Sequence, residues 1–77
     1  MLDLYYSDSC PYCKKVLNYF NSKGIEFNLK DINLSENYDT VMRIGHIAQV
    51  PFLIDTESGQ ALYDSDSIIS YVDSMYT

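Results

Sequence analysis

Cys10 and Cys13 are the only cysteines in the chain, and Pro11 and Tyr12 separate them. Proline is favoured at the first position of a helix, because its missing N–H costs nothing there and its fixed φ suits the turn. We therefore expect Cys10 to cap a helix and Cys13 to lie in its first turn, where the two sulfurs face the same side. The free N–H groups and the dipole of that helix end favour a negative charge on Cys10. Its thiolate should then form more easily than that of a free cysteine.

This asymmetry is typical of a redox-active disulfide, in which Cys10 attacks and Cys13 resolves the mixed disulfide. Three other interpretations use the same residues. The cysteines could be buried packing residues, or a static disulfide, which is rare inside cells. They could also be half of a zinc site, but only His46 could join them as a nitrogen or sulfur ligand, and a structural site needs four ligands. The proline, the predicted helix and the strand before it favour the redox interpretation.

Length, charge and hydropathy exclude several classes of protein. With 77 residues, the chain is expected to form a single domain, residues 1–77, with a small core. The formal net charge of −6 argues against nucleic acid and anionic membrane surfaces as general partners. No apolar run approaches the roughly 18 residues that a membrane span needs, and the first residues lack the features of a secretory signal. We therefore expect a cytoplasmic protein that contacts no membrane.

The first part of the chain predicts a strand, a helix and a second strand. Residues 2–6 alternate apolar and polar side chains, as in a strand with one buried face. A helix is expected over residues 11–23, ended by Gly24, and a strand over residues 25–30. Such a unit places the two strands parallel, with a right-handed crossover between them.

A second helix is expected next. Either Asn33 or Ser35 can cap it, and Glu36 stands three positions after Asn33, as in a capping box. Gly45 can end this helix, and residues 46–49 then form a loop with His46 on the surface. The side chains expected on its buried face are Tyr38, Val41, Met42 and Ile44.

The rest of the chain predicts a hairpin and a last helix. A turn is expected over residues 55–59. The strands on either side of it, over residues 52–54 and 60–63, are close enough to pair antiparallel. Asp64 or Ser65 can cap the last helix. Its buried stripe is expected from Ile68, Ile69, Val72 and Met75, which Tyr76 can join. The order βαβαββα predicts an α/β, thioredoxin-like fold, with a mixed four-stranded sheet and three helices.

With these elements placed, the chain resembles the glutaredoxins over its whole length. Cys10 to Cys13 match the dithiol motif Cys-Pro-Tyr-Cys of that family. The segment 42–51 ends in Val50-Pro51, and the segment 63–72 carries Asp64-Ser65 at the start of the last helix. Both segments are similar to those of glutaredoxins whose N-terminal domain is built like that of glutathione transferases. Each of these two motifs is weak alone, but their order and spacing are specific.

The resemblance implies a catalytic nucleophile at Cys10, a resolving thiol at Cys13 and a cis peptide bond between Val50 and Pro51. It implies glutathione as a co-substrate, with no tightly bound cofactor and no metal. The residues that it assigns to glutathione binding are Tyr12, Gln49, Val50, Pro51, Asp64 and Ser65.

One position departs from the family pattern. Many glutaredoxins carry Lys or Arg three residues before the first cysteine, where this chain has Ser7. Such a cation would help to hold the thiolate and the glycine carboxylate of glutathione. The residues that could take its place are Lys14, Lys15, Arg43 and Gln49, and the sequence does not choose among them.

The leading functional hypothesis is a monomeric, glutathione-dependent thiol–disulfide oxidoreductase. Its expected partners are glutathione and proteins that carry disulfides or glutathione mixed disulfides. A second hypothesis is the N-terminal glutathione-binding domain of a glutathione transferase-like protein, which the Asp64-Ser65 motif favours. A third is a binding module that holds an iron–sulfur cluster between two chains through Cys10 and glutathione.

Overall fold

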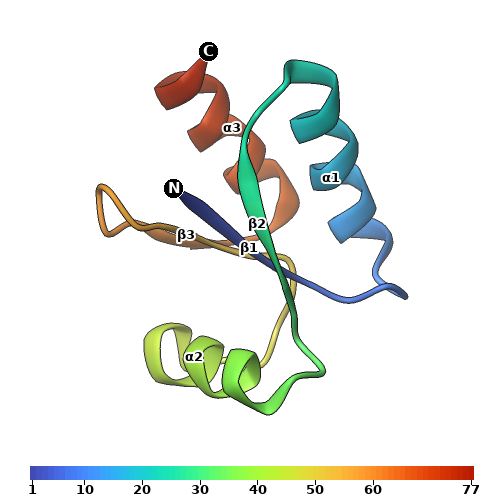
Figure 1. Ribbon diagram of the computed structural model, residues 1–77, viewed down its shortest axis with the longest axis vertical. Helices are drawn as coiled ribbons and strands as arrows, with labels where there is room; N and C mark the ends of the chain where they lie inside the picture. The colour runs from blue at the N-terminus through green and yellow to red at the C-terminus, as the bar shows by residue number, and fades with distance from the viewer.

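Seven elements follow one another in the computed structural model, which describes all residues 1–77 (Figure 1). The sheet has the order β2-β1-β3-β4, with β1 parallel to β2 and antiparallel to β3, and with β3 antiparallel to β4. This arrangement confirms the predicted order and the thioredoxin-like fold class. The elements are β1 (Leu2–Tyr6), α1 (Pro11–Lys23), β2 (Phe27–Asp31), α2 (Ser35–Gly45), β3 (Phe52–Asp55), β4 (Ala61–Tyr63) and α3 (Ser65–Tyr76).

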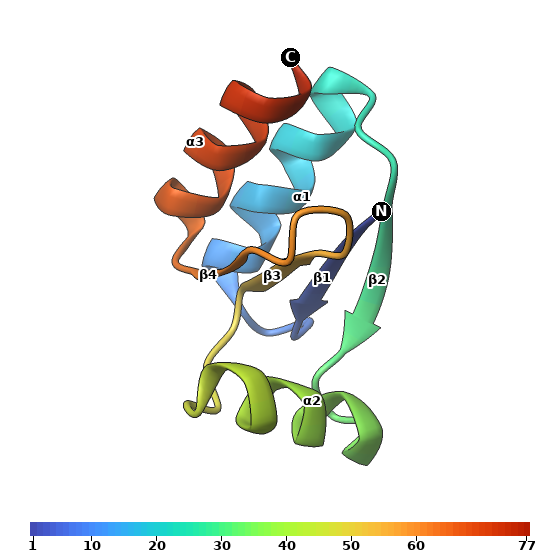
Figure 2. The ribbon, with the colours of Figure 1, turned by 90° about the vertical axis from the view of Figure 1, so that its left-hand side faces the viewer.

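Helices α1 and α3 lie side by side on one face of the sheet, and α2 lies on the opposite side (Figures 1 and 2). The main core lies between the sheet and helices α1 and α3. Because each of its side chains is almost wholly removed from water, this cluster supplies most of the hydrophobic stabilisation. Its buried members are Leu2, Leu4, Val16, Phe20, Leu53, Ile68 and Val72.

The end of α1 explains why β2 begins later than the sequence predicts. Gly24 adopts a left-handed φ of 66°, and its N–H points back to carbonyl groups of the last turn. The N–H of Ile25 is also used to close the helix, 2.9 Å from the Phe20 oxygen. The strand predicted from residue 25 therefore starts only at Phe27.

Helix α2 departs most from the prediction. Only Val41 of its expected apolar face is buried, where it packs with Tyr5 and Phe52 in a small second cluster. Figure 2 shows α2 alone on the side of the sheet opposite to α1 and α3, so no other helix packs against the rest of its surface. The three remaining side chains that were expected to be buried are exposed: Tyr38, Met42 and Ile44.

The predicted capping box at the start of α2 is wrong. The N-cap position is Leu34, and no side chain caps this helix. Asp31 turns the chain instead, because its carboxylate accepts a hydrogen bond from the Asn33 N–H at 2.9 Å. Its carbonyl oxygen accepts another from the side-chain amide of Asn37, also at 2.9 Å.

The stripe of α3 is confirmed in its first half. Ile68 and Val72 are buried and Ile69 is half-buried, but Met75 is exposed. Tyr76 uses its hydroxyl rather than its ring, because this hydroxyl donates a hydrogen bond to Asp55 at 2.7 Å. The last turn of α3 is therefore held to the sheet by polar contacts.

Asp55 is a buried carboxylate at the end of β3, where the sequence predicted only a turn. Its side chain accepts hydrogen bonds from the Tyr71 hydroxyl at 2.6 Å, from Tyr76, and from the Glu57 N–H at 3.0 Å. Burial raises the pKa of Asp55, but these donors and the Ser58 N–H outweigh it and lower the pKa to about 2. The carboxylate thus joins α3 and the β3–β4 turn.

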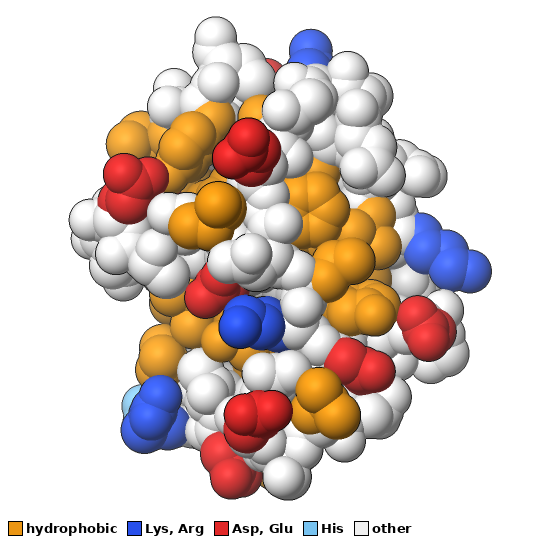
Figure 3. All heavy atoms as spheres, in the orientation of Figure 1, with side chains coloured by type: hydrophobic (Ala, Val, Ile, Leu, Met, Phe, Trp, Pro, Cys, Tyr) orange, Lys and Arg blue, Asp and Glu red, His pale blue; other side chains and the backbone are white.

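No helix has the length and continuous apolar character needed to cross a bilayer. Figure 3 shows one face of the molecule, on which acidic side chains are spread among a few Lys and Arg. This pattern agrees with the chain total of 11 acidic against 5 basic residues.

The Asp55→Asn variant should lose about 2 kcal/mol of unfolding free energy at pH 7, because hydrogen bonds to a charged acceptor are the strong ones. The folded pKa of Asp55 lies below the ordinary 3.8. Its ionised form therefore stabilises the protein above pH 3.8, and this contribution is lost as the pH falls towards 2. Urea unfolding from pH 7 to pH 2 measures the difference from wild type. Asp39→Asn, at an exposed site on α2, is the control. An equal loss for Asp55→Asn at both ends of this range would contradict the assignment.

Candidate functional site

Cys10 is the N-cap of α1, as predicted, with Pro11 in the first turn. Its sulfur accepts a hydrogen bond from the Cys13 N–H at 3.1 Å. The Cys10 thiol also lies 3.8 Å from the Val50 carbonyl oxygen, to which it donates a long hydrogen bond. A negative charge on this sulfur would face the positive end of the helix dipole, which stabilises it.

Cys13 is completely buried in the first turn, whereas Cys10 is half-exposed, and both thiols are free. Burial, followed by the hydrogen bond with Cys10, raises the pKa of Cys13 to about 12. The two sulfurs are therefore chemically unequal. Cys10 is accessible to solvent, and the raised pKa keeps Cys13 protonated beside it at neutral pH.

The peptide bond between Val50 and Pro51 is cis, as the resemblance implied. It lies directly before β3, so the backbone of Val50 is turned towards Cys10 rather than into the sheet. Val50 is half-buried and Pro51 is buried. The Val50 backbone beside the Cys10 sulfur is suited to pairing with an extended, peptide-like ligand.

Asp64 has an unusual backbone at the start of α3, with φ 77° and ψ 130°. A side chain rarely adopts this conformation, and such residues cluster at functional sites. Asp64 occupies the N-cap position of α3, as predicted, but its side chain makes no capping hydrogen bond to the helix. The Asp64 carboxylate instead accepts a hydrogen bond from the Ser67 hydroxyl at 3.0 Å and is exposed.

Ser65 is the first residue of α3 and is only 3% exposed. The Ser65 hydroxyl makes no hydrogen bond within the chain. Every fully buried side-chain oxygen or nitrogen does have a partner, so the Ser65 hydroxyl oxygen is not fully buried. This hydroxyl must therefore reach the solvent through the small opening beside it. The start of α3 offers its free N–H groups at the same place.

One cleft of about 260 Å³ brings together the six residues that the resemblance assigned to glutathione. Figure 2 shows how, because the starts of α1 and α3 and the segment before β3 meet at one edge of the molecule. Cys10 adjoins this cleft through its contact with Val50. The lining residues are Tyr12, Gln49, Val50, Pro51, Asp64 and Ser65.

Of the four residues considered for the missing cation, only Gln49 lines the cleft. Lys15 is occupied elsewhere, in an ion pair of 2.6 Å with Asp66. Lys14 and Arg43 are exposed and do not line it.

His46 is a surface residue with a left-handed φ of 69° at the end of α2, as its predicted loop position indicated. It is not part of the cleft. The chain has no group of three or more His, Cys, Asp or Glu side chains placed to hold a metal ion.

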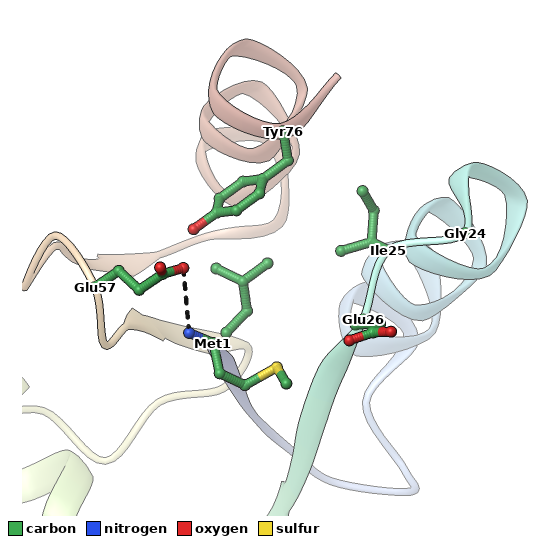
Figure 4. A pocket seen from close by; sticks show the side chains of 7 residues that line it. Met1, Gly24, Ile25, Glu26, Glu57 and Tyr76 are labelled. Carbon is green, nitrogen blue, oxygen red and sulfur yellow. Dashed lines mark hydrogen bonds and ion pairs between the residues drawn. The ribbon is translucent and has the colours of Figure 1, made fainter.

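A larger hollow of about 490 Å³ lies at the other end of β1, away from the cysteines (Figure 4). The Met1 ammonium group points to Glu57 there, with an ion pair of 3.5 Å. Ile25 and Tyr76 close its sides. It contains neither a nucleophile nor a strained residue, so the cleft beside Cys10 remains the candidate site.

Tyr63 is a positioning residue that sequence reasoning missed. Its hydroxyl donates to the Ile47 carbonyl oxygen at 2.6 Å and accepts from the Ile47 N–H at 3.3 Å. The ring packs so closely on α2 that a Cβ at Gly45 would overlap the hydroxyl. Tyr63 and Ile47 are 16 positions apart, so no local pattern could have revealed the pair. Together these contacts hold the loop that carries Gln49 and Val50.

Comparisons with known proteins agree on one family. Residues 4–77 match the family described as Glutathione S-transferase, N-terminal domain. A curated relative, an isoprene-epoxide–glutathione S-transferase from Rhodococcus sp. (strain AD45), is 34% identical over 65 residues. That match covers 84% of this chain but only 25% of the relative.

Solved structures give the same result. A glutathione S-transferase from Methylobacillus flagellatus KT, with GSH bound, is 30% identical and superposes with a TM-score of 0.82. The match covers 100% of this chain and 37% of that one. Glutathione transferase Omega 3C from Trametes versicolor, at 24% identity and a TM-score of 0.85, shares the fold over 97% of this chain and 33% of its own. The chain thus spans about a third or less of the length of most of these relatives.

The Tyr63 contact can be tested without any ligand. In Tyr63→Phe the hydroxyl is lost, and the Ile47 amide should exchange with solvent roughly fivefold faster, because one net hydrogen bond contributes about 1 kcal/mol. Hydrogen exchange followed by NMR measures this rate. Tyr38→Phe, on the exposed side of α2, is the matched control and should leave it unchanged. If both variants exchange at the wild-type rate, the loop is held by other contacts.

Proposed function

Because the chain belongs to the glutathione S-transferase N-terminal domain family, we propose that its cleft binds glutathione and that Cys10 makes it a glutathione-dependent thiol–disulfide oxidoreductase. The observation that carries this proposal is the placement of Cys10. A half-exposed thiol at a helix N-terminus, with a buried second thiol behind it, adjoins a cleft with free backbone groups. This is the arrangement that thiol–disulfide exchange requires.

Each part of glutathione has a suitable partner in the cleft. The cysteinyl part can pair with the Val50 backbone as an added strand, which brings its sulfur to Cys10. The γ-glutamyl carboxylate can accept hydrogen bonds from the start of α3 and from the Ser65 hydroxyl. The γ-glutamyl ammonium can pair with the exposed Asp64 carboxylate.

The proposed reaction has two exchanges. The Cys10 thiolate attacks the glutathione sulfur of a mixed disulfide, so a bond forms between these two sulfurs and the substrate leaves as its thiolate, which takes up a proton. The thiolate of a second glutathione then attacks the glutathionylated Cys10. Glutathione disulfide leaves, and Cys10 returns as the thiolate. In sum, one reduced glutathione is consumed, and the disulfide bond passes from the substrate to glutathione disulfide.

Cys13 offers a second route for protein disulfides. Its thiol displaces the group bound to Cys10 and forms a Cys10–Cys13 disulfide, while its proton passes to the departing sulfur. Two glutathione molecules then restore both thiols and leave as glutathione disulfide. Since burial holds the pKa of Cys13 at about 12, this route is slower at neutral pH than the one through Cys10 alone.

The family match favours a second candidate, the glutathione-binding part of a conjugating transferase. The aligned segment makes up only 37% of the matched structure and 25% of the curated relative. In this case the cleft would present the glutathione sulfur to an electrophile bound by another part of the protein. Conjugation of an aryl halide to glutathione distinguishes this candidate from disulfide reduction.

The proposed partners are glutathione and proteins that carry disulfides or glutathione mixed disulfides. The reaction consumes reduced glutathione, so it belongs in a compartment with a reduced thiol pool, such as the cytoplasm. A single chain carries every residue of the proposed cycle, so we propose that it acts as a monomer.

Cys10→Ser should abolish reduction of a small glutathione mixed disulfide, with a loss of at least about 1,000-fold, because the nucleophile is gone. Cys13→Ser should keep this activity within about threefold, because that route uses only one thiol. The rate of glutathione disulfide formation measures both. A Cys13→Ser variant as inactive as Cys10→Ser would show that the roles are assigned wrongly.

Ser65→Ala and Asp64→Asn should each raise the apparent KM for glutathione mixed disulfides roughly fivefold, as expected for the loss of about 1 kcal/mol of binding. Reduction of a cyclic disulfide by dithiothreitol, which needs no glutathione, should stay near the wild-type rate. Ser67→Ala, which removes only the hydrogen bond to Asp64, is the control for a structural effect. Equal losses with both substrates, in step with the melting temperature, would mean that these residues only support the helix.

A further inference from the structure

The cleft beside Cys10 is lined by a single charged side chain, and that side chain is acidic. Asp64 supplies this charge. The other lining residues are neutral, and only Tyr12, Gln49 and Ser65 among them carry polar side-chain groups. None of the five Lys and Arg residues of the chain lines the cleft.

The nearest candidates for a cation are engaged or remote from the lining. Lys15 is paired with Asp66 at 2.6 Å, which would have to break before its ammonium group could serve a ligand. Lys14 points from the exposed side of α1, and Arg43 from the exposed side of α2. The chain as a whole carries a net charge of −6, so the surrounding field does not favour an anion either.

Glutathione brings two carboxylates and one ammonium group to this cleft. Under the proposed function, the ammonium pairs with Asp64, and the γ-glutamyl carboxylate faces Ser65 and the start of α3. The carboxylate of the glycine end is then left without a cationic partner. The neutral donors of the lining that remain are the Tyr12 hydroxyl and the Gln49 amide. Gln49 directly precedes Val50, with which the cysteinyl part pairs under the proposed function.

We propose that the cleft, with the neutral Gln49 at the glycine end of the thiol co-substrate, does not select for a negative charge there. The inference rests on the proposed function and defines its substrate class. The site would accept γ-glutamyl-cysteinyl thiols with a neutral third residue as readily as glutathione. A neutral amide donor binds a carboxylate and a carboxamide oxygen with similar geometry, whereas a Lys or Arg would favour the carboxylate strongly.

The glycinamide analogue of glutathione tests this directly, because a neutral amide replaces the glycine carboxylate at almost the same size. With a small mixed disulfide as substrate, the wild-type kcat/KM for glutathione and for the analogue should agree within about twofold. A site that binds the glycine carboxylate through its negative charge would have a kcat/KM for glutathione about tenfold or more above that for the analogue.

Gln49→Lys should create the missing preference and raise the ratio of the two kcat/KM values at least about threefold in favour of glutathione. Gln60→Lys is the matched control. It adds the same charge at an exposed position outside the cleft and should leave the ratio unchanged. A wild-type preference of tenfold or more for glutathione, or an unchanged ratio in Gln49→Lys, would overturn the inference.

Failure of the proposed function gives a different result. If neither thiol supports turnover, the oxidoreductase proposal is wrong. Binding of S-methylglutathione and its glycinamide to the Cys10→Ser variant, measured by calorimetry, then decides the inference alone. Similar affinities support it, and tighter binding of the charged form by tenfold or more, or no binding of either, overturns it.

Discussion

The packing of α1 and α3 against one face of the sheet is the constraint on which the site depends. Val16 and Phe20 of α1 and Ile68 and Val72 of α3 are buried in the same core. Because this core fixes both helices, their N-terminal ends meet at one edge of the sheet (Figure 2). One end carries Cys10, and the other carries the free N–H groups near Ser65. Two helix ends that favour negative charge are thus brought to one cleft by apolar contacts elsewhere.

The third wall of the cleft is built differently. This wall is the loop before β3, which carries Gln49 and Val50. Tyr63 holds it through two hydrogen bonds to Ile47, and the bare Gly45 lets the Tyr63 ring approach α2. Hydrogen bonds to a backbone fix a position more sharply than apolar contact does. The Val50 carbonyl can therefore lie at a defined distance from the Cys10 sulfur.

The chain combines a transferase-type domain with a dithiol. Its family and its structural relatives are glutathione transferases, while the Cys-Pro-Tyr-Cys motif places two unequal thiols at the start of α1. Function depends on such a site rather than on the fold that carries it. Under the proposed function, the same cleft holds glutathione for either chemistry, and the Cys10 sulfur is the nucleophile for exchange with a disulfide.

The sequence alone determined what depends on a few neighbouring residues. The start of α1 at Pro11, the cap at Cys10 and the turn at Gly24 are local, because φ preferences and helix-end hydrogen bonds act within one turn. The alternation of β1 and the order of the elements follow from short periodic patterns, and they were enough for the fold class. The residues assigned to the cleft came from resemblance to a family, and the fold brings all six together.

Only the tertiary structure decided the features that join distant parts of the chain. The exposure of most of α2 depends on its position as the single helix on its side of the sheet, which its own amphipathic pattern does not contain. Asp55 looked like a turn residue until Tyr71 and Tyr76 were folded onto it. The left-handed backbone of Asp64 is imposed by the β4–α3 junction against the residue's own preference. In each case a contact between segments far apart in sequence outweighs a local tendency, because burial and paired hydrogen bonds are worth more than the few tenths of a kcal/mol to about 1 kcal/mol that local propensity provides.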